Sequence, residues 1–524
     1  MIILLVALFI VFISIWLWFD NSKIKGFSLA GLLTLAIYWR ISSWQYPLSL
    51  CIDEAEWLAL ASRLKDCTIP FQCYNGSTTG FLSIGLLNVM PTLGLDLSYF
   101  NLRIFGFILC IIPAAILCYY GIRKWYGASV AKQVFPWLSM FMIFGFYNRE
   151  FLTYNTEYLL MVFYAAVFYL FATWKQNNFG SKWEPIGMAL LLGIMPYVKL
   201  QSVPFVFAWY GILLWMGWRN KTWSRLLVWH AALALATLVF AGYFLYRNIF
   251  MDFYRMYIES NAYYVNHRIT SYKYSDNEFI HRLRAFKGMH ITTFMPLYLG
   301  LLPLILWGLR KKTTRQNSYN QICWPCLWIF ICVCYSTYTT GNGYGHYNVL
   351  LIVPVMFLLG NVYHIFNAEG MKIQNALTVI GLVIPMTIYA RRAEIFKYDT
   401  TFSLTETEKY IINTTGSGEK VLYMGWVEAL EAQVRTQRRL PVRNATYQYI
   451  GIGDSSLRGY YQKGFFHDMQ ENKPRYVLDM ENVMEMPGLK PVKAFILQHY
   501  ILDTILEDNL IYKLKNNHTD VSIK

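Results

Sequence analysis

Two adjacent carboxylates, Asp53 and Glu54, follow the second long apolar run of this chain, which ends near Tyr46. A carboxylate at the exit of a membrane-spanning helix is costly to keep near lipid, so the pair marks a candidate functional site. The alternative is helix capping, because acidic side chains are favoured in the first turn of a helix. Capping alone does not explain two acidic residues in succession at a membrane face.

A second acidic stretch contains Arg149, Glu150 and Glu157. Arg149 and Glu150 are equally consistent with an ordinary solvated ion pair. Glu157 is the sharper candidate because it enters the next apolar run, where Asn155 or Thr156 could cap the helix without it. We therefore expect Glu157 to belong to the site.

A glycine-rich turn, Thr339–Tyr347, carries Tyr344, His346 and Tyr347 directly before another apolar run. Its flexible backbone and its histidine make it a candidate for substrate binding. A histidine that is only hydrogen-bonded at the start of a helix is the alternative.

Lys199 is the one charge in the stretch Ile186–Trp218, which is too long for a single membrane helix. Pro196 and Pro204 flank the lysine, and proline interrupts helices. The stretch is therefore predicted to form two helices with Lys199 at the turn, just below the outer surface.

The long connection between Tyr243 and His290 mixes arginines, among them Arg247 and Arg255, with many tyrosines. Long ordered loops tend to be functional. Arginine forks bind phosphate oxygens and aromatic faces cover apolar surface, so such a loop suits a phosphate head group or a sugar. A solvated connecting loop is equally consistent with the pattern.

The elements that position these residues must be membrane helices, because 56% of the residues are hydrophobic and 15% are charged. About twelve spans are expected at roughly 20 residues each. Basic residues gather in alternate connections, which by the positive-inside rule face the cytoplasm: Lys23, Lys25, Arg123, Lys124, Lys132, Lys175, Lys182, Arg219, Lys221, Arg225, Arg310, Lys311, Lys312 and Arg315. The candidate residues all lie in the other connections, so a polar site is predicted on the outer face.

The net charge of +15 is spread between the apolar runs. Membrane topology and anionic lipid phosphates explain it better than nucleic acid does. Among the cysteines, Cys67 and Cys73 in the first outward loop are the pair that could form a disulfide in an oxidising compartment.

The pattern changes after Tyr389 to a mixed polar sequence, so we divide the chain into a transmembrane catalytic domain, 1–390, and a soluble α/β domain, 391–524. The catalytic domain is expected to carry outward-facing loops at 46–97 and 247–290. Lys420–Trp426 and Pro474–Met480 read as buried strands, and Thr405–Glu408 fits a capping box. The fold class is thus a polytopic α-helical membrane protein with a C-terminal soluble α/β domain on the outer side.

These motifs together resemble the GT-C glycosyltransferases, in particular the bacterial protein mannosyltransferase-like and aminoarabinose transferase-like branches. The resemblance rests on the Asp-Glu pair, the acidic second outward loop, the turn Val198-Lys-Leu-Gln201 and the histidine turn. Met424-Gly-Trp-Val-Glu428 and Arg439-Leu-Pro-Val-Arg-Asn444 are similar to patterns of many bacterial members. An added helix before the one that delivers the Asp-Glu pair departs from the common arrangement.

The resemblance implies an inverting transferase in the bacterial cytoplasmic membrane. It would move a sugar from a polyprenyl-phosphate donor to an acceptor on the outer, periplasmic side. Asp53 would be the general base, with Glu54 and Glu157 orienting the acceptor or tuning that base. Lys199 and His346 would bind the donor phosphate, together with Arg247 and Arg255. Arg149, Tyr344 and Tyr347 are the remaining substrate-binding candidates.

Several alternatives stay open at this point. The acceptor could be lipid A, another envelope lipid, a glycan such as O-antigen, or a protein. No cofactor is implied with certainty, and a divalent cation remains an alternative because metal dependence varies among GT-C enzymes. A lipid or solute transporter or flippase is the alternative function. That function would favour charges near the bilayer midplane and repeated halves, neither of which is apparent.

Overall fold

The computed structural model describes residues 2–144, 149–219, 223–267, 277–309, 324–339, 344–366, 371–392, 403–451 and 455–515. The chain divides into two compact units, each built from three segments. Unit 1 consists of Met1–Trp44, Arg103–Tyr243 and His267–Tyr398, and unit 2 of Gln45–Leu102, Phe244–Asn266 and Asp399–Lys524. The basic connection at 310–315, the middle of the loop 247–290 and the glycines at 341 and 343 lie outside the described residues.

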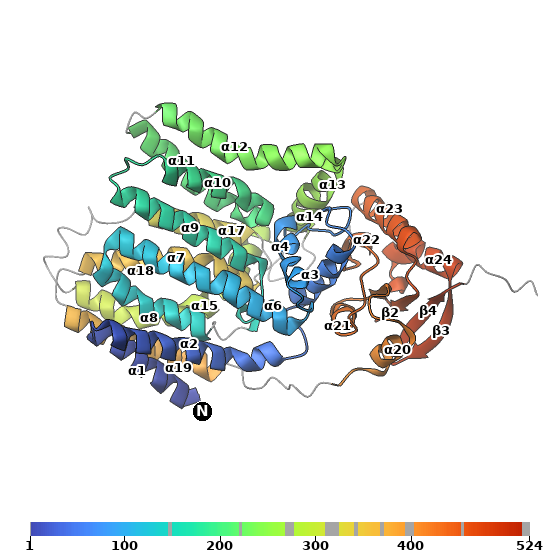
Figure 1. Ribbon diagram of the computed structural model, residues 1–524, viewed down its shortest axis with the longest axis horizontal. Coiled ribbons are helices and arrows are strands. Elements are labelled where there is room, and N and C mark those ends of the chain that lie inside the picture. The colour runs from blue at the N-terminus through green and yellow to red at the C-terminus, as the bar shows by residue number, and fades with distance from the viewer. Residues whose placement is uncertain are drawn as a thin grey trace, which may run out of the picture. The chain divides into compact units, whose positions relative to one another are not determined.

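Unit 1 is a bundle of helices that lie side by side (Figure 1). Within the described residues, twelve helices with fifteen residues or more belong wholly or mainly to it: α1 (Ile2–Trp18), α2 (Ser22–Gln45), α7 (Ile112–Tyr126), α8 (Ala128–Phe144), α9 (Thr156–Gln176), α10 (Trp183–Val198), α11 (Val203–Arg219), α12 (Trp223–Tyr246), α15 (Glu278–Leu309), α17 (Trp324–Thr339), α18 (Val349–Phe366) and α19 (Met371–Arg392). A shorter helix, α6 (Tyr99–Gly106), runs into α7 through a π turn.

Six stretches of the described residues are long and apolar enough to cross a membrane: Ser22–Gln45, Tyr99–Tyr126, Thr156–Gln176, Leu200–Arg219, Arg225–Tyr246 and Gly345–Ile365. Large apolar side chains on these helices face outward; Phe207 and Leu227, for example, are 71% and 74% exposed. Such a surface suits lipid, because a soluble protein rarely exposes large contiguous apolar patches. The chain is therefore a polytopic helical membrane protein, as its composition predicts.

Helix α9 lies in the interior of the bundle, where it packs against α7, α10 and α18. Its aromatic residues explain this position: the ring of Tyr164 stacks on Phe205 of α11 at 3.6 Å, and Phe168 stacks on Phe357 of α18 at 4.2 Å. Burial of large rings contributes strongly to packing. The first turn of α9, which carries Glu157, is thereby held inside unit 1.

Unit 2 combines the C-terminal residues with the whole of the predicted first outward loop, 46–97, and the start of the loop at 247–290. Its four-stranded sheet has the order β1-β2-β4-β3, with β1 and β2 parallel and the other pairs antiparallel. The elements are α3 (Ile52–Ser62), α4 (Phe81–Leu86), α5 (Val89–Thr92), α13 (Phe250–Phe253), α14 (Ser260–His267), α20 (Glu406–Thr414), β1 (Val421–Met424), α21 (Val427–Arg435), α22 (Gln448–Gly451), α23 (Ser455–Asn472), β2 (Tyr476–Asp479), α24 (Lys490–His499), β3 (Tyr500–Leu506) and β4 (Asn509–Leu514).

The local predictions for unit 2 are confirmed. Both predicted strands form, as β1 and β2, and all their residues are buried. The capping box is present at the start of α20: Thr405 Oγ1 accepts a hydrogen bond from Glu408 N at 3.2 Å, and a carboxylate oxygen of Glu408 accepts one from Thr405 N at 3.0 Å. Short-range patterns of this kind depend on a few neighbouring residues, which is why the sequence predicts them well.

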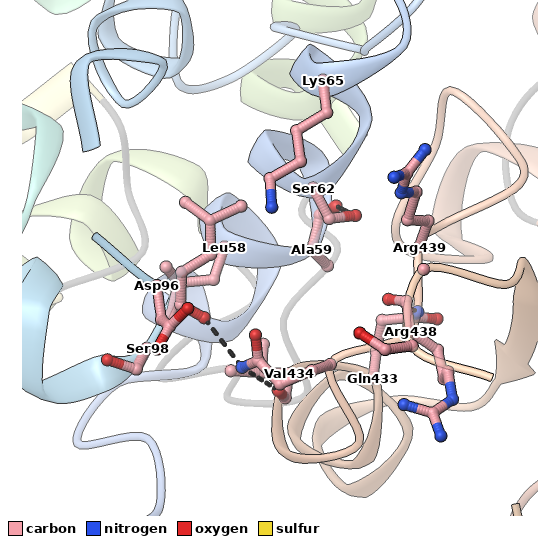
Figure 2. A pocket seen from close by; sticks show the side chains of 14 residues that line it. Leu58, Ala59, Ser62, Lys65, Asp96, Ser98, Gln433, Val434, Arg438 and Arg439 are labelled. Carbon is pink, nitrogen blue, oxygen red and sulfur yellow. Dashed lines mark hydrogen bonds between the residues drawn. The ribbon is translucent and has the colours of Figure 1, made fainter. Parts of the chain in front are cut away.

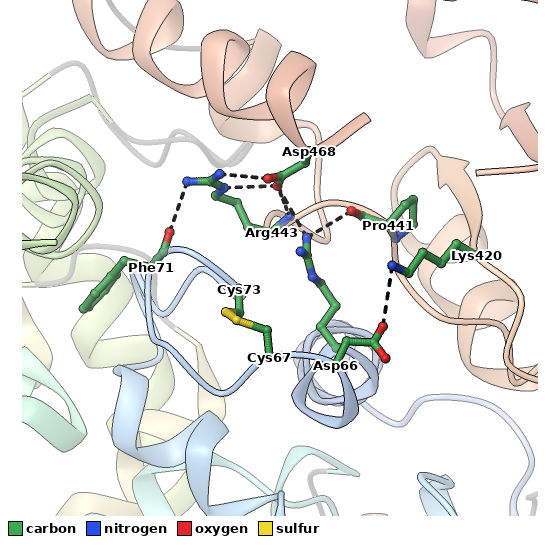
Figure 3. The surroundings of a disulfide bond; sticks show 9 residues. Asp66, Cys67, Phe71, Cys73, Lys420, Pro441, Arg443 and Asp468 are labelled. Atoms are coloured by element: carbon green, nitrogen blue, oxygen red, sulfur yellow. Dashed lines mark hydrogen bonds and ion pairs between the residues drawn. A yellow bond between two sulfur atoms is a disulfide. The ribbon is translucent and has the colours of Figure 1, made fainter. Parts of the chain in front are cut away.

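The disulfide between Cys67 and Cys73 is also present (Figure 3). Its loop is held within unit 2 by Arg443, whose Nη1 donates to the carbonyl oxygen of Phe71 at 3.4 Å. Arg443 in turn forms a bidentate ion pair with Asp468, at 2.7 Å and 3.0 Å. Arg443, the second arginine of the motif Arg439-Leu-Pro-Val-Arg-Asn444, therefore links the disulfide loop to Asp468 within unit 2.

The spacing of Trp57, Leu60, Ala61 and Leu64 predicts an amphipathic helix from Asp53 to Leu64 that lies on the membrane with one apolar face. Helix α3, which carries the Asp-Glu pair, is instead buried on more than that face. Leu58 and Ala59, outside the predicted apolar stripe, are as buried as Trp57 and Leu60 within it. The reason is that α21 of the same unit packs against α3. The amphipathic pattern alone did not reveal this second covering element.

Candidate active site

The first turn of α9 brings Glu157 into a buried polar cluster of unit 1. Asn155 occupies the N-cap position, as the sequence indicates, but its side chain makes no capping bond to the helix. Its amide Nδ2 instead donates to Thr153 Oγ1 at 2.9 Å and to the carbonyl oxygen of Glu150. Glu157 lies in the first turn of α9, where the helix dipole favours the negative charge of its carboxylate.

Lys199 is the partner of Glu157. Its Nζ lies 2.5 Å from Glu157 Oε1 and donates a second bond to Thr156 Oγ1 at 3.1 Å. As predicted, Lys199 lies at the turn between α10 and α11. Its backbone is extended and directly follows Val198, the last residue of α10. An ammonium group has three N–H donors. Two are used by Glu157 and Thr156, so the third is available to a ligand oxygen.

His346 connects the cluster to a second carboxylate. It lies in a short 3₁₀ turn, Gly345–Asn348, at the start of α18. Its Nδ1 is 3.0 Å from Glu150 Oε2, and its backbone N donates to the same oxygen at 2.8 Å. Because an ionised carboxylate only accepts, Nδ1 carries the hydrogen. The opposite ring nitrogen, Nε2, lies 3.8 Å from Glu157 Oε1.

Two tyrosines of the same turn surround these groups. The ring of Tyr344 stacks on His346 at 5.5 Å, and the ring of Tyr347 meets His346 edge to face at 4.6 Å. Lys199 Nζ also lies 5.5 Å from the centre of the Tyr347 ring, a cation–π distance. The aromatic rings therefore restrict the orientation of both the imidazole and the ammonium group.

The structure thus brings together Glu157, Lys199, Tyr344, His346 and Tyr347, which the sequence selected separately. It adds Glu150, which the sequence left undecided between a site residue and a solvated ion pair. The sequence feature that pointed to Glu150 is its position in the second outward loop, which also contains Glu157. Arg149 belongs to the same unit and begins the short helix Arg149–Phe151, but its side chain lies outside the described residues.

The Asp-Glu pair belongs to unit 2, where it occupies the first turn of α3. Glu54 is fully buried, and its Oε2 accepts a hydrogen bond from Leu50 N at 3.0 Å. Asp53 is partly exposed, which leaves it accessible to a substrate. The Glu54 carboxylate therefore binds a backbone N–H ahead of the helix and holds the chain where it enters α3.

The two predicted loop arginines also belong to unit 2. Arg247 is exposed in the turn that follows α12. Arg255 forms an ion pair with Glu259, one helical turn away, at 2.8 Å, and its Nη1 is 3.4 Å from Ser456 Oγ.

The chemistry of the cluster follows from its charges. Glu157, Lys199 and His346 are 0%, 7% and 3% exposed, and charged groups persist at such burial only when they are paired. Lys199 balances the charge of Glu157 within this cluster. The third N–H of Lys199 can bind an anionic oxygen, and intramembrane groups of this kind mark substrate sites.

Two solved structures have a fold similar to that of this chain. The structure of ArnT from Cupriavidus metallidurans bound to undecaprenyl phosphate superposes with a TM-score of 0.58 and 11% identity, over 93% of this chain and 98% of that one. The apo structure of the same ArnT gives a TM-score of 0.58 and 10% identity, over 94% and 98%. No family model and no curated protein sequence matches the chain. The likeness confirms the fold that the resemblance of the sequence motifs implied.

Proposed function

We propose that this protein is a glycosyltransferase that takes a sugar from a polyprenyl-phosphate donor and transfers it to an acceptor hydroxyl or phosphate of the cell envelope. The main support is the buried Glu157–Lys199–His346 cluster in a chain with the ArnT fold. Undecaprenyl phosphate is bound in the ArnT structure with which this chain superposes over 93% of its length. A lipid-linked donor also explains why a polar site is built at the end of membrane helices.

The donor phosphate is assigned to Lys199 and His346. Negative charge develops on the phosphate oxygen as the glycosidic bond breaks, and a preorganised cation stabilises that charge most in a water-poor site. Lys199 has one N–H left for it after binding Glu157 and Thr156. Arg247 and Arg255 of unit 2 are secondary candidates for binding the donor phosphate. Arg255 already forms an ion pair with Glu259, which would compete with the phosphate for it.

The base is assigned to Asp53. In the proposed step the acceptor oxygen attacks the anomeric carbon, the bond from that carbon to the phosphate oxygen breaks, and polyprenyl phosphate leaves. The acceptor proton passes to the Asp53 carboxylate, and the configuration at the anomeric carbon inverts. Glu54 and Glu157 would orient the acceptor or tune the base, and Arg149, Tyr344 and Tyr347 would contact the substrates. The proposal assigns no step to a metal ion.

The site is assigned to the outer, periplasmic side of the bacterial cytoplasmic membrane. The support is the charge pattern, because the basic connections alternate with those that carry the candidate residues. Lipid A, another envelope glycan and protein hydroxyls all remain as acceptors, since each offers a nucleophilic oxygen.

The test uses the purified full-length chain in lipid nanodiscs. Undecaprenyl phosphate carrying aminoarabinose or mannose is supplied with lipid A, a polysaccharide or a serine-rich peptide. Mass spectrometry follows the acceptor and the released undecaprenyl phosphate. We expect one donor–acceptor pair to give a glycosylated acceptor and an equal amount of free undecaprenyl phosphate.

A heat-inactivated sample and the Asp53→Asn protein serve as controls. Intact donor with every acceptor would contradict the proposal for these sugars. Movement of the intact lipid-linked sugar across a sealed vesicle membrane, without transfer, would instead establish the transporter alternative.

A further inference from the structure

Glu150 belongs to the buried cluster of unit 1, yet the proposed reaction gives it no role. Its carboxylate binds one residue twice: Oε2 accepts a hydrogen bond from His346 N at 2.8 Å and lies 3.0 Å from His346 Nδ1. Because one bond is to the backbone and the other is to the ring, the carboxylate fixes both the place and the rotation of the imidazole. This double contact indicates a positioning role for Glu150.

The turn that carries Glu150 is itself held in place. The carbonyl oxygen of Glu150 accepts bonds from Thr153 Oγ1, at 2.9 Å, and from Asn155 Nδ2. Tyr158 OH donates to the carbonyl oxygen of Phe151, the next residue along the chain. Thr153, Asn155 and Tyr158 are all buried. The start of α9 therefore anchors Glu150, so the fold sets the position of its carboxylate.

The neighbours of His346 define the charge of its ring. Nδ1 carries a hydrogen, because the ionised carboxylate of Glu150 only accepts. The opposite nitrogen, Nε2, lies 3.8 Å from Oε1 of a second carboxylate, Glu157. A neutral ring would place a lone pair at Nε2, near this negative oxygen, whereas an imidazolium carries an N–H on both nitrogens. Both carboxylates therefore favour the imidazolium form.

The charges of the cluster balance in the same way. Among the described residues of unit 1, the cluster holds two carboxylates, Glu150 and Glu157, and one ammonium group, Lys199. Charged groups persist in a buried site only when they are paired. A protonated His346 supplies the missing positive charge, and the tyrosines of the same turn add none because a phenol is neutral at physiological pH.

We propose that Glu150 is a positioning residue that keeps His346 protonated and turns its Nε2–H toward the donor phosphate. This role rests on the proposed function, in which the donor phosphate is the ligand of His346. Lys199 Nζ and His346 Nε2 lie near the same oxygen, Glu157 Oε1, at 2.5 Å and 3.8 Å. Two cationic N–H donors that converge in this way favour an anionic oxygen beside them. Glu150 is negative and would repel a phosphate, so it acts only through His346.

A cavity in unit 2 offers an alternative place for an anion. Its volume is about 430 Å³, and Lys65, Arg438 and Arg439 lie in its wall (Figure 2). Arg438 already donates to Thr415 Oγ1 at 2.7 Å and to the carbonyl oxygen of Thr415 at 2.8 Å. Arg439 Nη1 donates to Asp66 Oδ1. Lys65 is exposed, where an ion pair contributes little. The cations of this cavity are thus already bonded or solvated, which favours the buried cluster of unit 1.

The first test reads the protonation of His346 directly. Solid-state NMR is recorded at neutral pH on the full-length protein in zwitterionic lipid nanodiscs, with isotope-labelled histidine. The His346→Gln protein identifies the signals of His346. We expect two protonated ring nitrogens in the wild type. Glu150→Gln keeps an acceptor for His346 but removes the charge, so one ring nitrogen should lose its hydrogen.

Two further variants complete the series. Glu150→Asp keeps the charge on a shorter side chain, so we expect it to retain the imidazolium. Glu184→Gln removes a partly exposed carboxylate at the opposite end of α10 from Lys199 and should leave the ring unchanged. Thermal unfolding of each variant checks that the fold is intact.

A binding measurement connects the ring to its ligand and needs no sugar transfer. Undecaprenyl phosphate is titrated into the same samples, and undecaprenol, which lacks the phosphate, is the control lipid. We expect undecaprenyl phosphate to shift the Nε2 signal of the wild type and undecaprenol to leave it unchanged. The affinity for undecaprenyl phosphate should fall about tenfold in Glu150→Gln, as for loss of a hydrogen bond to a charged group. Glu184→Gln should bind like the wild type.

A neutral ring in the wild type, or an imidazolium that persists in Glu150→Gln, would overturn the positioning role. Equal affinity of the wild type and Glu150→Gln for undecaprenyl phosphate would overturn the link to the phosphate. If the ring and the binding behave as expected but no acceptor receives a sugar, the positioning role stands and the transferase proposal fails.

Discussion

Lys199 Nζ lies 2.5 Å from Glu157 Oε1, and both groups are buried in unit 1. In the sequence Lys199 is a lone cation in an apolar stretch, whereas in the structure it is one half of a buried ion pair. A buried ion pair need not stabilise a protein, but removal of one partner leaves an uncompensated charge. Any experiment on Lys199 must therefore separate the loss of the pair from the loss of a phosphate ligand.

The variant Lys199→Met should weaken donor use much more than acceptor binding. Loss of a hydrogen bond to a charged group costs about 1.5–3 kcal/mol, which corresponds to roughly a 10- to 100-fold rise in the apparent KM for the donor. The variant should also be less stable, by about 3–5 kcal/mol, because Glu157 is left unpaired. Donor titration and thermal unfolding, both in nanodiscs, measure the two effects.

The double variant Lys199→Met, Glu157→Gln serves as the control for folding. It removes the unpaired charge, so we expect it to recover most of the lost stability. If donor affinity in the single variant is unchanged, Lys199 does not bind the phosphate.

The variant Asp53→Asn should lower the transfer rate by about 10²–10⁴-fold, the usual contribution of a positioned general base. Its fold should survive, because loss of one carboxylate from the first turn of α3 typically costs only about 0.3–1 kcal/mol. Single-turnover transfer measures the chemical step, and circular dichroism checks the fold.

The matched control for Asp53 is Glu56→Gln, which removes a partly exposed carboxylate from the same helix. We expect it to retain near-normal turnover. A well-folded Asp53→Asn protein with the wild-type rate would leave Asp53 as a structural residue, and the base would then be sought at Glu54 or Glu157.

The variant Asp468→Asn should destabilise unit 2. Asp468 accepts bonds from the Arg443 side chain and from Arg443 N at 2.7 Å, and it lies 3.4 Å from Arg63 Nη1. Burial acts to lower the pKa of Arg443, but Asp468 outweighs it and raises that pKa. Loss of this carboxylate leaves the buried Arg443 and the half-buried Arg63 without that partner, at a cost of about 3–5 kcal/mol.

Hydrogen exchange of the peptides around residues 63–75 reports on this change, because Arg443 binds the disulfide loop. Glu471→Gln, an exposed position one turn further along α23, is the control and should exchange like the wild type. Equal protection in Asp468→Asn would show that the network does not hold the loop.

Asp479 should make the sheet of unit 2 less stable as the pH rises. Burial raises the pKa of Asp479 from 3.8 to about 6, against the effect of hydrogen bonds from Met484 N and Val483 N. The folded state therefore binds the proton more tightly than the unfolded state, and its stability falls between about pH 4 and pH 6. Protection factors of peptides 476–484 should drop by roughly one to two orders of magnitude over this interval, since each pKa unit corresponds to about a factor of ten.

Asp479→Asn removes the titrating group but keeps an acceptor for Met484 N. Its protection factors should stay constant over the same interval. A wild-type profile as flat as that of the variant would mean that Asp479 titrates at its ordinary value.

The sequence was sufficient for features that depend on near neighbours. The prolines around Lys199 mark the turn between α10 and α11, Thr405 and Glu408 form the capping box, and Cys67 pairs with Cys73 six residues away. Hydrophobicity and the spacing of basic residues likewise predict a bundle of membrane helices. Each of these signals is contained in a short window of the chain.

Only the tertiary structure decided which distant side chains meet. Glu157 and Lys199 are 42 residues apart, and Glu150 and His346 are 196 apart. Their contacts depend on which faces of α9, α11 and α18 pack together, and nearly uniform apolar helices carry little information about that choice. The same holds for α3, which α21 buries on a face that its own sequence pattern leaves open. Local patterns specify elements, whereas the pairing of charges in this site arises from how the elements pack.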